Sequence, residues 1–341
     1  IALIGMVTTK GTSSIYNAAL TMFDGATNFP LLAIPLFILA GALMNTTSIS
    51  RRLINLTSAL IGFVRGGLAM VNVGVSMFFA EISGSAVADV AAIGSVLIPA
   101  MKNRNYTPEL SAAVTSSSAS IAIIIPPSIA MIIYGALSDT SIVQLFVAGI
   151  IPGVVGGFSM MGLCYWYAVR YNLPREEAFS VGRLWTAFKE AGWALTLPVI
   201  ILGGIFGGIV TATEGAGLAV VAALIIGGFI YREINWTHLR KAMVEGVIQT
   251  AVVMLLVATS AVLGLYLTEM QVPQYFASWM MSFTSNKIMV LALLNVMLFV
   301  VGMFLHGAAA IILIVPIVMP LVHQLGINPI QFGLIMTLNI A

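Results

Sequence analysis

Long runs of apolar residues, interrupted by short polar stretches, constrain this chain more than any other feature. The run from Val247 to Leu267 holds no charged side chain. Only 8% of the residues are charged and 60% are hydrophobic, whereas a soluble domain carries about 25% charged residues. About 20 apolar residues are enough to cross a bilayer as a helix. The sequence therefore predicts an all-α polytopic membrane protein.

The positions of the basic residues predict which side of the membrane each loop faces, because Lys and Arg mark cytoplasmic loops. Arg51, Arg52 and Arg65 lie within Asn45–Gly67, and further basic residues follow at Lys102 and from Arg170 to Lys189. Asn45–Gly67 also has apolar residues at helical spacing, which with its arginines is typical of a helix lying in the membrane interface. These apolar residues are Ile49, Leu53, Leu56, Leu60 and Phe63.

Two short apolar segments, Leu68–Ala80 and Ala86–Pro99, follow this interfacial segment. Each is too short to cross the bilayer, and basic residues lie on both outer flanks. We therefore expect a re-entrant hairpin with its polar tip at Ser83–Asp89. Polar groups and helix breaks are costly at membrane depth, so this tip is a candidate functional site.

A crossing segment, Leu110–Tyr134, contains a second interruption formed by serines and a double proline. We expect this break to face the hairpin tip. The other apolar segments predict further crossings, a second interfacial segment and two more short limbs. They are Phe29–Met44, Ile142–Val169, Trp193–Ile230 (two crossings with a polar tip at Thr211–Glu214), Val247–Leu267, the interfacial Thr268–Asn286, and the limbs Ile288–Phe304 and Ala308–Pro320, with a polar, turn-rich stretch at Thr8–Asn28.

The two halves of the chain align without a gap at an offset of 221 residues, since Pro99 aligns with Pro320 (320 − 99) and Pro108 with Pro329 (329 − 108). The first interfacial segment and hairpin have basic flanks, and the second pair largely lacks them. By the positive-inside rule the two repeats therefore lie in opposite orientations. Inverted repeats with discontinuous helices are typical of secondary transporters.

The chain resembles the large membrane subunit of tripartite ATP-independent periplasmic (TRAP) transporters over essentially its whole length. Five segments carry the resemblance. They are FPLLAIPLFILAGALMN, ISGSAVADVAAIGSVLIPAM, IIPPSIAMIIYG, LFVAGIIPG and TATEGAG. The resemblance implies two inverted repeats with re-entrant helical hairpins and broken helices, as in ion-transporter-like elevator proteins. Two positions depart from the family pattern: Thr211–Gly215 lacks its usual proline, and His306 stands where an Asp is common.

The resemblance also implies a function and partners. It implies sodium-coupled import of an organic acid, typically sialic acid or a C4-dicarboxylate, across the bacterial inner membrane, with Na⁺ as the coupling ion. The expected partners are a small four-helix membrane subunit and a periplasmic substrate-binding protein, and no nucleic acid. Residues 1–65 would form the scaffold of repeat 1 with its arm helix, 66–170 its transport part, 171–287 the connection and the scaffold of repeat 2 with its arm, and 288–341 the transport part of repeat 2.

The hairpin tip and the break supply candidate oxygen ligands for sodium. Hard cations prefer oxygen, and a proline frees the carbonyl four residues earlier because it lacks an N–H. A carboxylate in the first turn of a helix is favoured by the helix dipole, so capping is the alternative role for Asp89, as it is for the serines of the tip. The candidate ion-binding residues are Ser83, Gly84, Ser85, Asp89, Ala122, Ile123 and Pro126, with His306 and Gly307 at the second tip.

The serine cluster opposite the tip presents hydroxyl groups to the same region. The candidate substrate-binding residues are Ser116, Ser117, Ser118, Pro127 and Ser128. Helix packing is the alternative for the serines, since membrane helix interfaces use small residues. A structural kink is compatible with a binding role for the prolines.

Other classes of protein fit this sequence less well. All three histidines lie in the second half, and we find no nucleotide-binding loop or metal-ligand motif that would suggest an enzyme. A single cysteine, Cys164, excludes a disulfide framework. The alternative function is a carboxylate transporter that needs no binding protein, or an antiporter with Asp89 as its proton carrier. Both chain ends are expected to be cut within apolar segments, and the partner of Pro126-Pro127 would fall near positions 347 and 348.

Overall fold

The computed structural model describes residues 2–83, 86–175 and 178–341. Every regular element in these ranges is helical, which confirms the all-α prediction. Five of the described helices are long and apolar enough to cross a membrane, or up to seven spans when each of two bent pairs is counted as one. The five are α9 (Ile142–Arg170), α10 (Val181–Phe206), α11 with η3 (Ala212–Ile230), α12 (Trp236–Glu269) and α15 (Gly307–Gln324).

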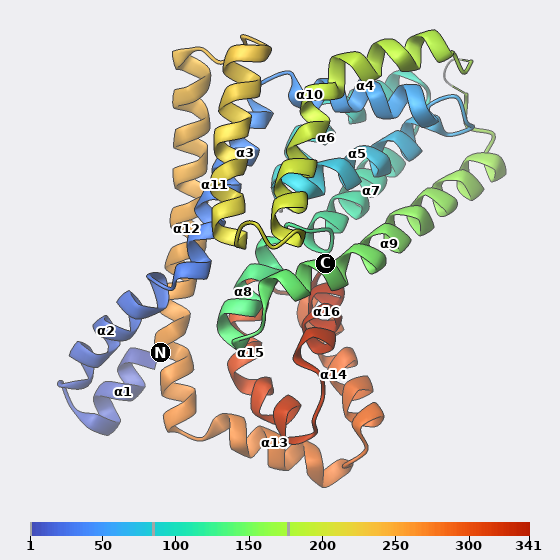
Figure 1. Cartoon of the computed structure of the whole chain (residues 1–341). Coiled ribbons are helices and arrows are strands. Elements are labelled where there is room, and N and C mark those ends of the chain that lie inside the picture. The colour runs from blue at the N-terminus through green and yellow to red at the C-terminus, as the bar shows by residue number, and fades with distance from the viewer. Residues whose placement is uncertain (1, 84–85, 176–177) are drawn as a thin grey trace. The chain divides into compact units, whose positions relative to one another are not determined.

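The helices form two compact units (Figure 1). Unit 1 is Ile1–Ile34, Ala130–Leu145 and Ile248–Ala341, and unit 2 is Pro35–Ile129 and Phe146–Val247. Unit 1 contains α1 (Ala2–Lys10), α2 (Ser14–Ala26), η1 (Phe29–Leu32), most of α8 (Ile129–Ser138), the longer part of α12, α13 (Val272–Phe283), α14 (Lys287–Gly302), α15 and α16 (Pro329–Ile340). Unit 2 contains most of α3 (Ala33–Asn45), α4 (Ile49–Ile61), α5 (Gly67–Ser83), α6 (Ala86–Asn103), α7 (Pro108–Ala119), η2 (Ser120–Ile123), most of α9, α10, α11 (Ala212–Leu224), the π-helical turn η3 (Ile225–Ile230) and the start of α12. The two units are defined by how compactly their residues pack, which does not test the roles of the segments. The four-part division into scaffold and transport segments therefore stays a prediction.

The helix bounds reproduce the internal repeat. Helix α6 begins at residue 86 and ends at 103, and α15 begins at 307 (86 + 221) and ends at 324 (103 + 221). Helices α7 and α16 match in the same way, from 108 and 329 to 119 and 340. The arm helices α4 and α13 also align, within two residues at each end. The repeat predicted from two proline pairs is therefore a repeat of structure, while the opposite orientation of its two copies stays a prediction.

The stretch Thr8–Asn28 differs from its prediction, because most of it is helical rather than a turn-rich connection. Helices α1 and α2 bury Met6 and Ala18 against Val262 of α12. A Cβ added at Gly25 would lie 2.7 Å from the Cβ of Ala261, so α2 packs closely on α12. Tertiary packing thus stabilises helices that the Thr, Asn and Gly content of the segment did not indicate.

The limbs of the first hairpin are also longer than expected. Helix α5 has 17 residues and α6 has 18, and α6 continues past Pro99 to Asn103. Both remain shorter than the roughly 20 residues of an average crossing helix. Helix α15 of the second hairpin, also 18 residues long, is long and apolar enough to cross. Length alone therefore does not separate a re-entrant limb from a crossing one.

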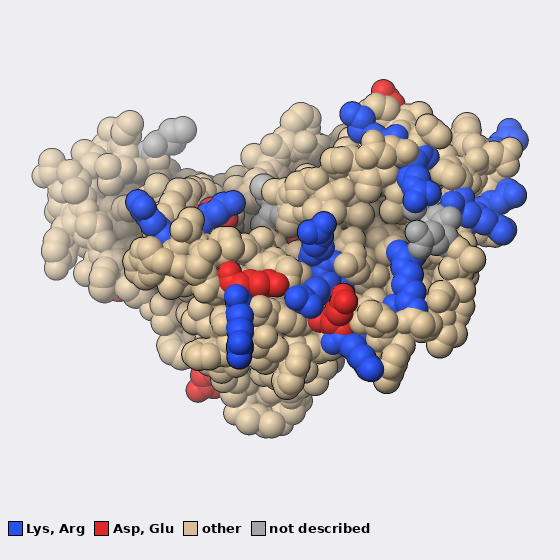
Figure 2. Space-filling model, turned by 90° about the horizontal axis from the view of Figure 1, so that it is seen from above, with Lys and Arg blue, Asp and Glu red and all other residues tan. Residues whose placement is uncertain are grey.

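Basic residues gather on unit 2. Of the 14 Lys and Arg residues in the sequence, Lys10 and Lys287 belong to unit 1 and the other 12 to unit 2. Figure 2 shows Lys and Arg side chains spread across one face of the molecule. This distribution agrees with a cytoplasmic side formed around α4, the start of α10 and the ends of α6, α9 and α11.

The amphipathic helix predicted within Asn45–Gly67 is α4, and a polar clamp holds its first turn. Glu233 accepts hydrogen bonds from the backbone N–H of Ser48 at 2.7 Å and from its hydroxyl at 2.5 Å. Arg52 forms an ion pair with the same carboxylate at 3.3 Å and lies over the ring of Tyr231 at 4.0 Å. The Tyr231 hydroxyl in turn donates to the carbonyl of Glu190 in α10. The clamp joins α4 to α10 and to the connection before α12.

Acid should weaken this clamp. Burial raises the pKa of the Glu233 carboxyl, but the hydrogen bonds from Ser48 and the neighbouring Arg52 together lower it by more. The pKa of this carboxyl therefore lies below its ordinary value. A depressed carboxyl pKa contributes stability that is present above the unfolded pKa of about 4.3 and is lost as pH falls through the folded pKa. We expect the clamp's contribution of about 1 kcal/mol to the free energy of unfolding to be lost once the pH lies below the folded pKa of Glu233. Unfolding of wild type and Glu233→Gln at pH 7 and at about pH 3, well below the unfolded pKa, checks this. An equal loss in both proteins on acidification would contradict it.

Gly66, between α4 and α5, is required by both its backbone conformation and its surroundings. Its φ is +70°, and an added Cβ would overlap the Cβ of Ala168 in α9. Gly66→Ala is expected to cost about 2–5 kcal/mol from positive-φ strain and overpacking together. Gly208 is a matched control, because its φ is +68° but no described heavy atom lies within 4 Å of the added Cβ. Gly208→Ala should therefore cost only about 1–2 kcal/mol. Chemical unfolding in detergent measures both, and equal costs would show that the contact with Ala168 is unimportant.

Candidate ion and substrate site

The first hairpin packs directly against the interrupted helix that follows it. Helix α5 contacts α6, α7 and η2, and η2 also contacts α6 and α7. A shared apolar core joins these elements, with Val73 of α5, Met101 of α6, Val114 of α7 and Ala122 of η2 among its buried members. The break is thereby held against both limbs of the hairpin.

A buried polar network connects α5 to α7. Asn72 donates through Nδ2 to Thr115 Oγ1 at 2.7 Å and accepts at Oδ1 from the Ser118 hydroxyl at 3.1 Å. The hydroxyl of Ser76 donates to that of Ser118 at 2.9 Å. All four side chains are at most 1% exposed. Because buried hydrogen-bonding groups are costly to leave unpaired, this network fixes the register of the two helices.

The break itself extends from η2 through Pro126 and Pro127 to Ser128. Ile124 and Ile125 both donate their backbone N–H to the carbonyl of Ile121. The carbonyl of Ile123, which the prolines were expected to free from helical bonding, accepts the Ser128 hydroxyl at 2.6 Å. Ser128 is fully buried and Ala122 is 0% exposed. The carbonyls of Ile121 and Ile123 are therefore both hydrogen-bonded within the break itself.

Asp89 is a fully buried carboxylate in the first turn of α6, with a relative exposure of 0%. A charge at this depth needs compensation, and the N-terminal end of a helix supplies part of it. Gly84 and Ser85 lie outside the described residues, and so does the side chain of Ser83. Asp89 therefore carries the geometric argument for the tip.

The serine cluster divides between two environments. Ser118 belongs to the buried network, whereas Ser116 and Ser117 are exposed. The Ser116 hydroxyl donates to the carbonyl of Ala113 on its own helix, and the carbonyl of Ser117 accepts the hydroxyl of Ser120. Ser116 and Ser117 thus remain candidates for a substrate-facing surface, and Ser118 connects that surface to the hairpin.

The second tip is built differently. His306 precedes α15 at its N-cap position without a side-chain capping bond, and Gly307 is buried. A Cβ at Gly302 would lie 2.5 Å from the carbonyl oxygen of Asn339, and one at Gly307 would lie 3.0 Å from Ile340. The tip therefore packs closely on the end of α16, the helix that aligns with α7. The described part of this tip has a histidine but no carboxylate.

Three residues of the buried network were missed by sequence reasoning, which singled out only Ser118. Asn72, Ser76 and Thr115 lie within α5 and α7 and look like isolated polar residues in the printed sequence. A usable signal is their spacing, because Asn72 and Ser76 are four apart and Thr115 and Ser118 three apart. Each pair therefore lies on one face of its helix.

The family of the chain follows from comparison with known proteins. The profile described as "Tripartite ATP-independent periplasmic transporter, DctM component" matches residues 1–341. The chain belongs to this family, and it is a large membrane subunit of the TRAP type, hence a multi-pass protein of the inner membrane and a transporter component rather than an enzyme.

Two relatives and one solved structure illustrate the likeness. The isethionate TRAP transporter permease protein DctMQ of Oleidesulfovibrio alaskensis is 40% identical over all of this chain, which spans 54% of that relative. The C4-dicarboxylate TRAP transporter large permease protein DctM of Pseudomonas aeruginosa is 37% identical over 96% of this chain and 76% of its own length. The YdaH transporter of Alcanivorax borkumensis, whose topology is described as unusual, shares the fold with a TM-score of 0.63 at 15% identity, over 97% of this chain and 77% of that one.

Proposed function

We propose that this chain is the membrane carrier of a sodium-coupled importer of organic-acid anions and that it works by an elevator mechanism. A periplasmic binding protein would deliver the substrate, and a small four-helix membrane subunit would complete the transporter in the bilayer. Family membership supports the transporter class. The burial of Asp89 in the first turn of α6, in a hairpin packed on the η2 break, carries the proposal of ion coupling.

The chemistry of the break suits a hard cation. Sodium prefers oxygen ligands, and this region offers a buried carboxylate together with the carbonyls and hydroxyl of the Ala122–Ser128 segment. Binding of the cation beside the hairpin would compensate the Asp89 charge. It would also order the residues that meet the substrate, so that ion and substrate bind together.

The substrate class is an organic-acid anion. The two relatives are named for isethionate and for C4-dicarboxylates, and both names denote organic anions. Exposed N–H groups at helix N-termini attract anions, and such termini occur at the starts of α6 and α15. Sialic acid and C4-dicarboxylates remain the expected substrates. Because the first relative is named for isethionate, isethionate is a third substrate to be tested.

Uptake by the complete membrane complex in proteoliposomes tests the proposal. Labelled sialic acid, a C4-dicarboxylate and isethionate are offered with and without an inward sodium gradient, and with and without the soluble binding protein. We expect one of them to accumulate only when both sodium and the binding protein are present. An inward gradient of potassium or choline, with the same binding protein, serves as the control.

The other outcomes identify a different transporter. Uptake that needs sodium but no binding protein would assign the chain to stand-alone symporters. Uptake driven by a proton gradient and unchanged by sodium would favour the antiporter in which Asp89 carries the proton. The first result overturns the dependence on a binding protein, the second overturns the sodium coupling, and both leave the family assignment intact.

A further inference from the structure

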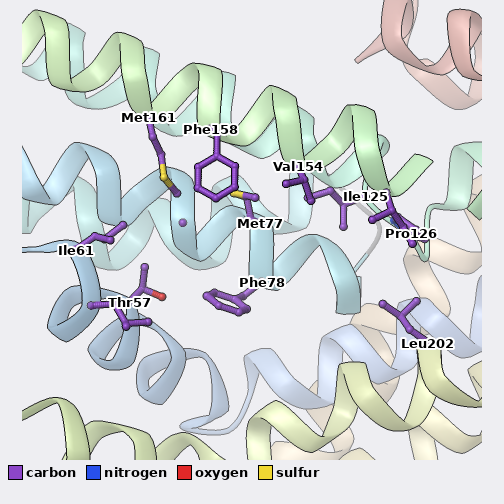
Figure 3. A pocket seen from close by; sticks show the side chains of 13 residues that line it. Thr57, Ile61, Met77, Phe78, Ile125, Pro126, Val154, Phe158, Met161 and Leu202 are labelled. Carbon is purple, nitrogen blue, oxygen red and sulfur yellow. The ribbon is translucent and has the colours of Figure 1, made fainter. Parts of the chain in front are cut away.

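An apolar cavity of about 300 Å³ lies within unit 2, beside the break. Its walls come from α4, α5, α9, α10 and the residues before Pro127, and Figure 3 shows the α4, α5 and α9 side chains around one hollow. The lining includes Ile61, Met77, Pro126, Phe158 and Met161. A cavity of this size is comparable to the smaller ligand pockets of proteins.

The lining selects an apolar occupant. Among the described lining residues, Thr57 has the one side-chain hydroxyl, and its Oγ1 already donates to the carbonyl of Leu53 at 2.8 Å. The other lining residues are aliphatic, aromatic or Met, together with one glycine and Pro126. Water gains few hydrogen bonds in such a space, and apolar cavities of this kind accept hydrocarbon ligands instead.

Several residues that line the cavity are also exposed on the outer surface of unit 2. Phe158 of α9 is 63% exposed, Leu60 of α4 is 40% exposed and Val154 is 36% exposed. Met77 and Ile61 line the same space but are less exposed. In a membrane protein, exposed apolar side chains of this kind face lipid tails. A chain can therefore enter from the bilayer past Leu60 and Phe158 and reach Met77.

Basic and aromatic groups lie near the C-terminal end of α4, the helix that lines the cavity through Thr57, Leu60 and Ile61. Arg183 Nη2 is 3.5 Å from the hydroxyl of Ser58, the residue that follows Thr57. Beyond the end of α4, the ring of Phe63 packs edge-on against Phe179 with centroids 5.2 Å apart, and Arg65 follows two residues later. Arginine is well suited to bind phosphate. At the membrane–water interface, basic side chains are commonly found together with aromatic rings.

We propose that a bilayer phospholipid binds here, with one acyl chain in the cavity and its phosphate at Arg183 and Arg65. The tail would fill the space between arm helix α4 and the Ile125–Pro126 segment of the break. The headgroup charge complements the arginines, and the lining complements the tail. The lipid is thus a structural ligand of the hairpin region, and its binding does not depend on the identity of the transported substrate.

Photo-cross-linking tests this site in the complete membrane complex. The complex is reconstituted in vesicles that carry a phosphatidylglycerol with a diazirine on its acyl chain, and labelled residues are mapped by mass spectrometry. We expect labelling of Met77 and Ile61, normalised to Val199, which is 70% exposed on α10 and samples bulk lipid. Val154→Phe narrows the entrance and should lower the Met77 signal about tenfold or more while leaving Val199 unchanged.

Headgroup recognition is tested separately. A diazirine diacylglycerol has the same tails without the phosphate and should label Met77 several-fold less than the phospholipid does. Arg183→Gln should lower phospholipid labelling toward the diacylglycerol level, with Arg65 still in place, and Arg240→Gln, a substitution of a basic residue of α12, serves as the control. Labelling of Met77 that stays equal to bulk labelling in every variant would overturn the proposal. Equal labelling by diacylglycerol would overturn the phosphate contact.

Discussion

The Asp89→Asn variant is expected to raise the half-saturating sodium concentration for uptake by about 10- to 100-fold. Asp89 is fully buried in the first turn of α6, and loss of a charge-assisted contact at such a position costs about 1.5–3 kcal/mol. Asparagine nearly matches the size of aspartate and is also favoured near helix starts. The variant therefore removes charge while keeping shape and capping ability. Uptake by reconstituted complex across a range of sodium concentrations measures the effect.

Asp139→Asn is the matched control. Asp139 is an exposed carboxylate after α8, and its φ of 52° is a conformation that asparagine also adopts readily. We expect its sodium dependence to equal that of wild type. If Asp89→Asn also kept the wild-type sodium dependence, with an intact fold by thermal unfolding, Asp89 would be a capping residue and the ion site would lie elsewhere.

Asn72→Leu is expected to lower the unfolding free energy of the protein by about 1–3 kcal/mol. The leucine removes the hydrogen bonds of Asn72 with Thr115 and Ser118. Both hydroxyl groups then have fewer partners, although their side chains are at most 1% exposed. Because the same network holds the hairpin to α7, substrate uptake should fall as well. Denaturant unfolding in detergent gives the free energy directly.

Two further variants show whether the network is responsible. Asn295→Leu makes the same substitution at an exposed position in α14, the aligned helix of the second hairpin, and should change stability little. The double variant Asn72→Leu with Ser118→Ala should lose less than the sum of the two single losses, with a coupling of at least about 0.5 kcal/mol. Strict additivity would mean that the two side chains act independently.

The long apolar helices were predictable from the sequence, because the length of each apolar run and its basic flanks mark a membrane crossing. The two crossings predicted over Trp193–Ile230 are α10, which already begins at Val181, and α11. Their polar tip is a capping box in which Thr211 and Glu214 bond each other's backbone. The repeat was also predictable, since two proline pairs at one spacing give the offset.

Long-range polar contacts were not predictable. The clamp on α4 joins Ser48 to Glu233, 185 residues away, and neither residue belongs to a motif. The Asn72 network likewise depends on how α5 and α7 pack, which a single sequence does not state. Helices α1 and α2 were missed for a related reason, since they depend on packing against α12 rather than on intrinsic propensity.

The central claim is that sodium and an organic-acid anion cross the membrane together through this chain. Simultaneous measurement of radioactive sodium and labelled substrate entering the same proteoliposomes, with the binding protein outside, tests it most directly. We predict that substrate and binding protein together stimulate sodium influx, in a fixed ratio to the substrate taken up, and that neither does so alone. Substrate influx without any substrate-stimulated sodium influx would contradict the account.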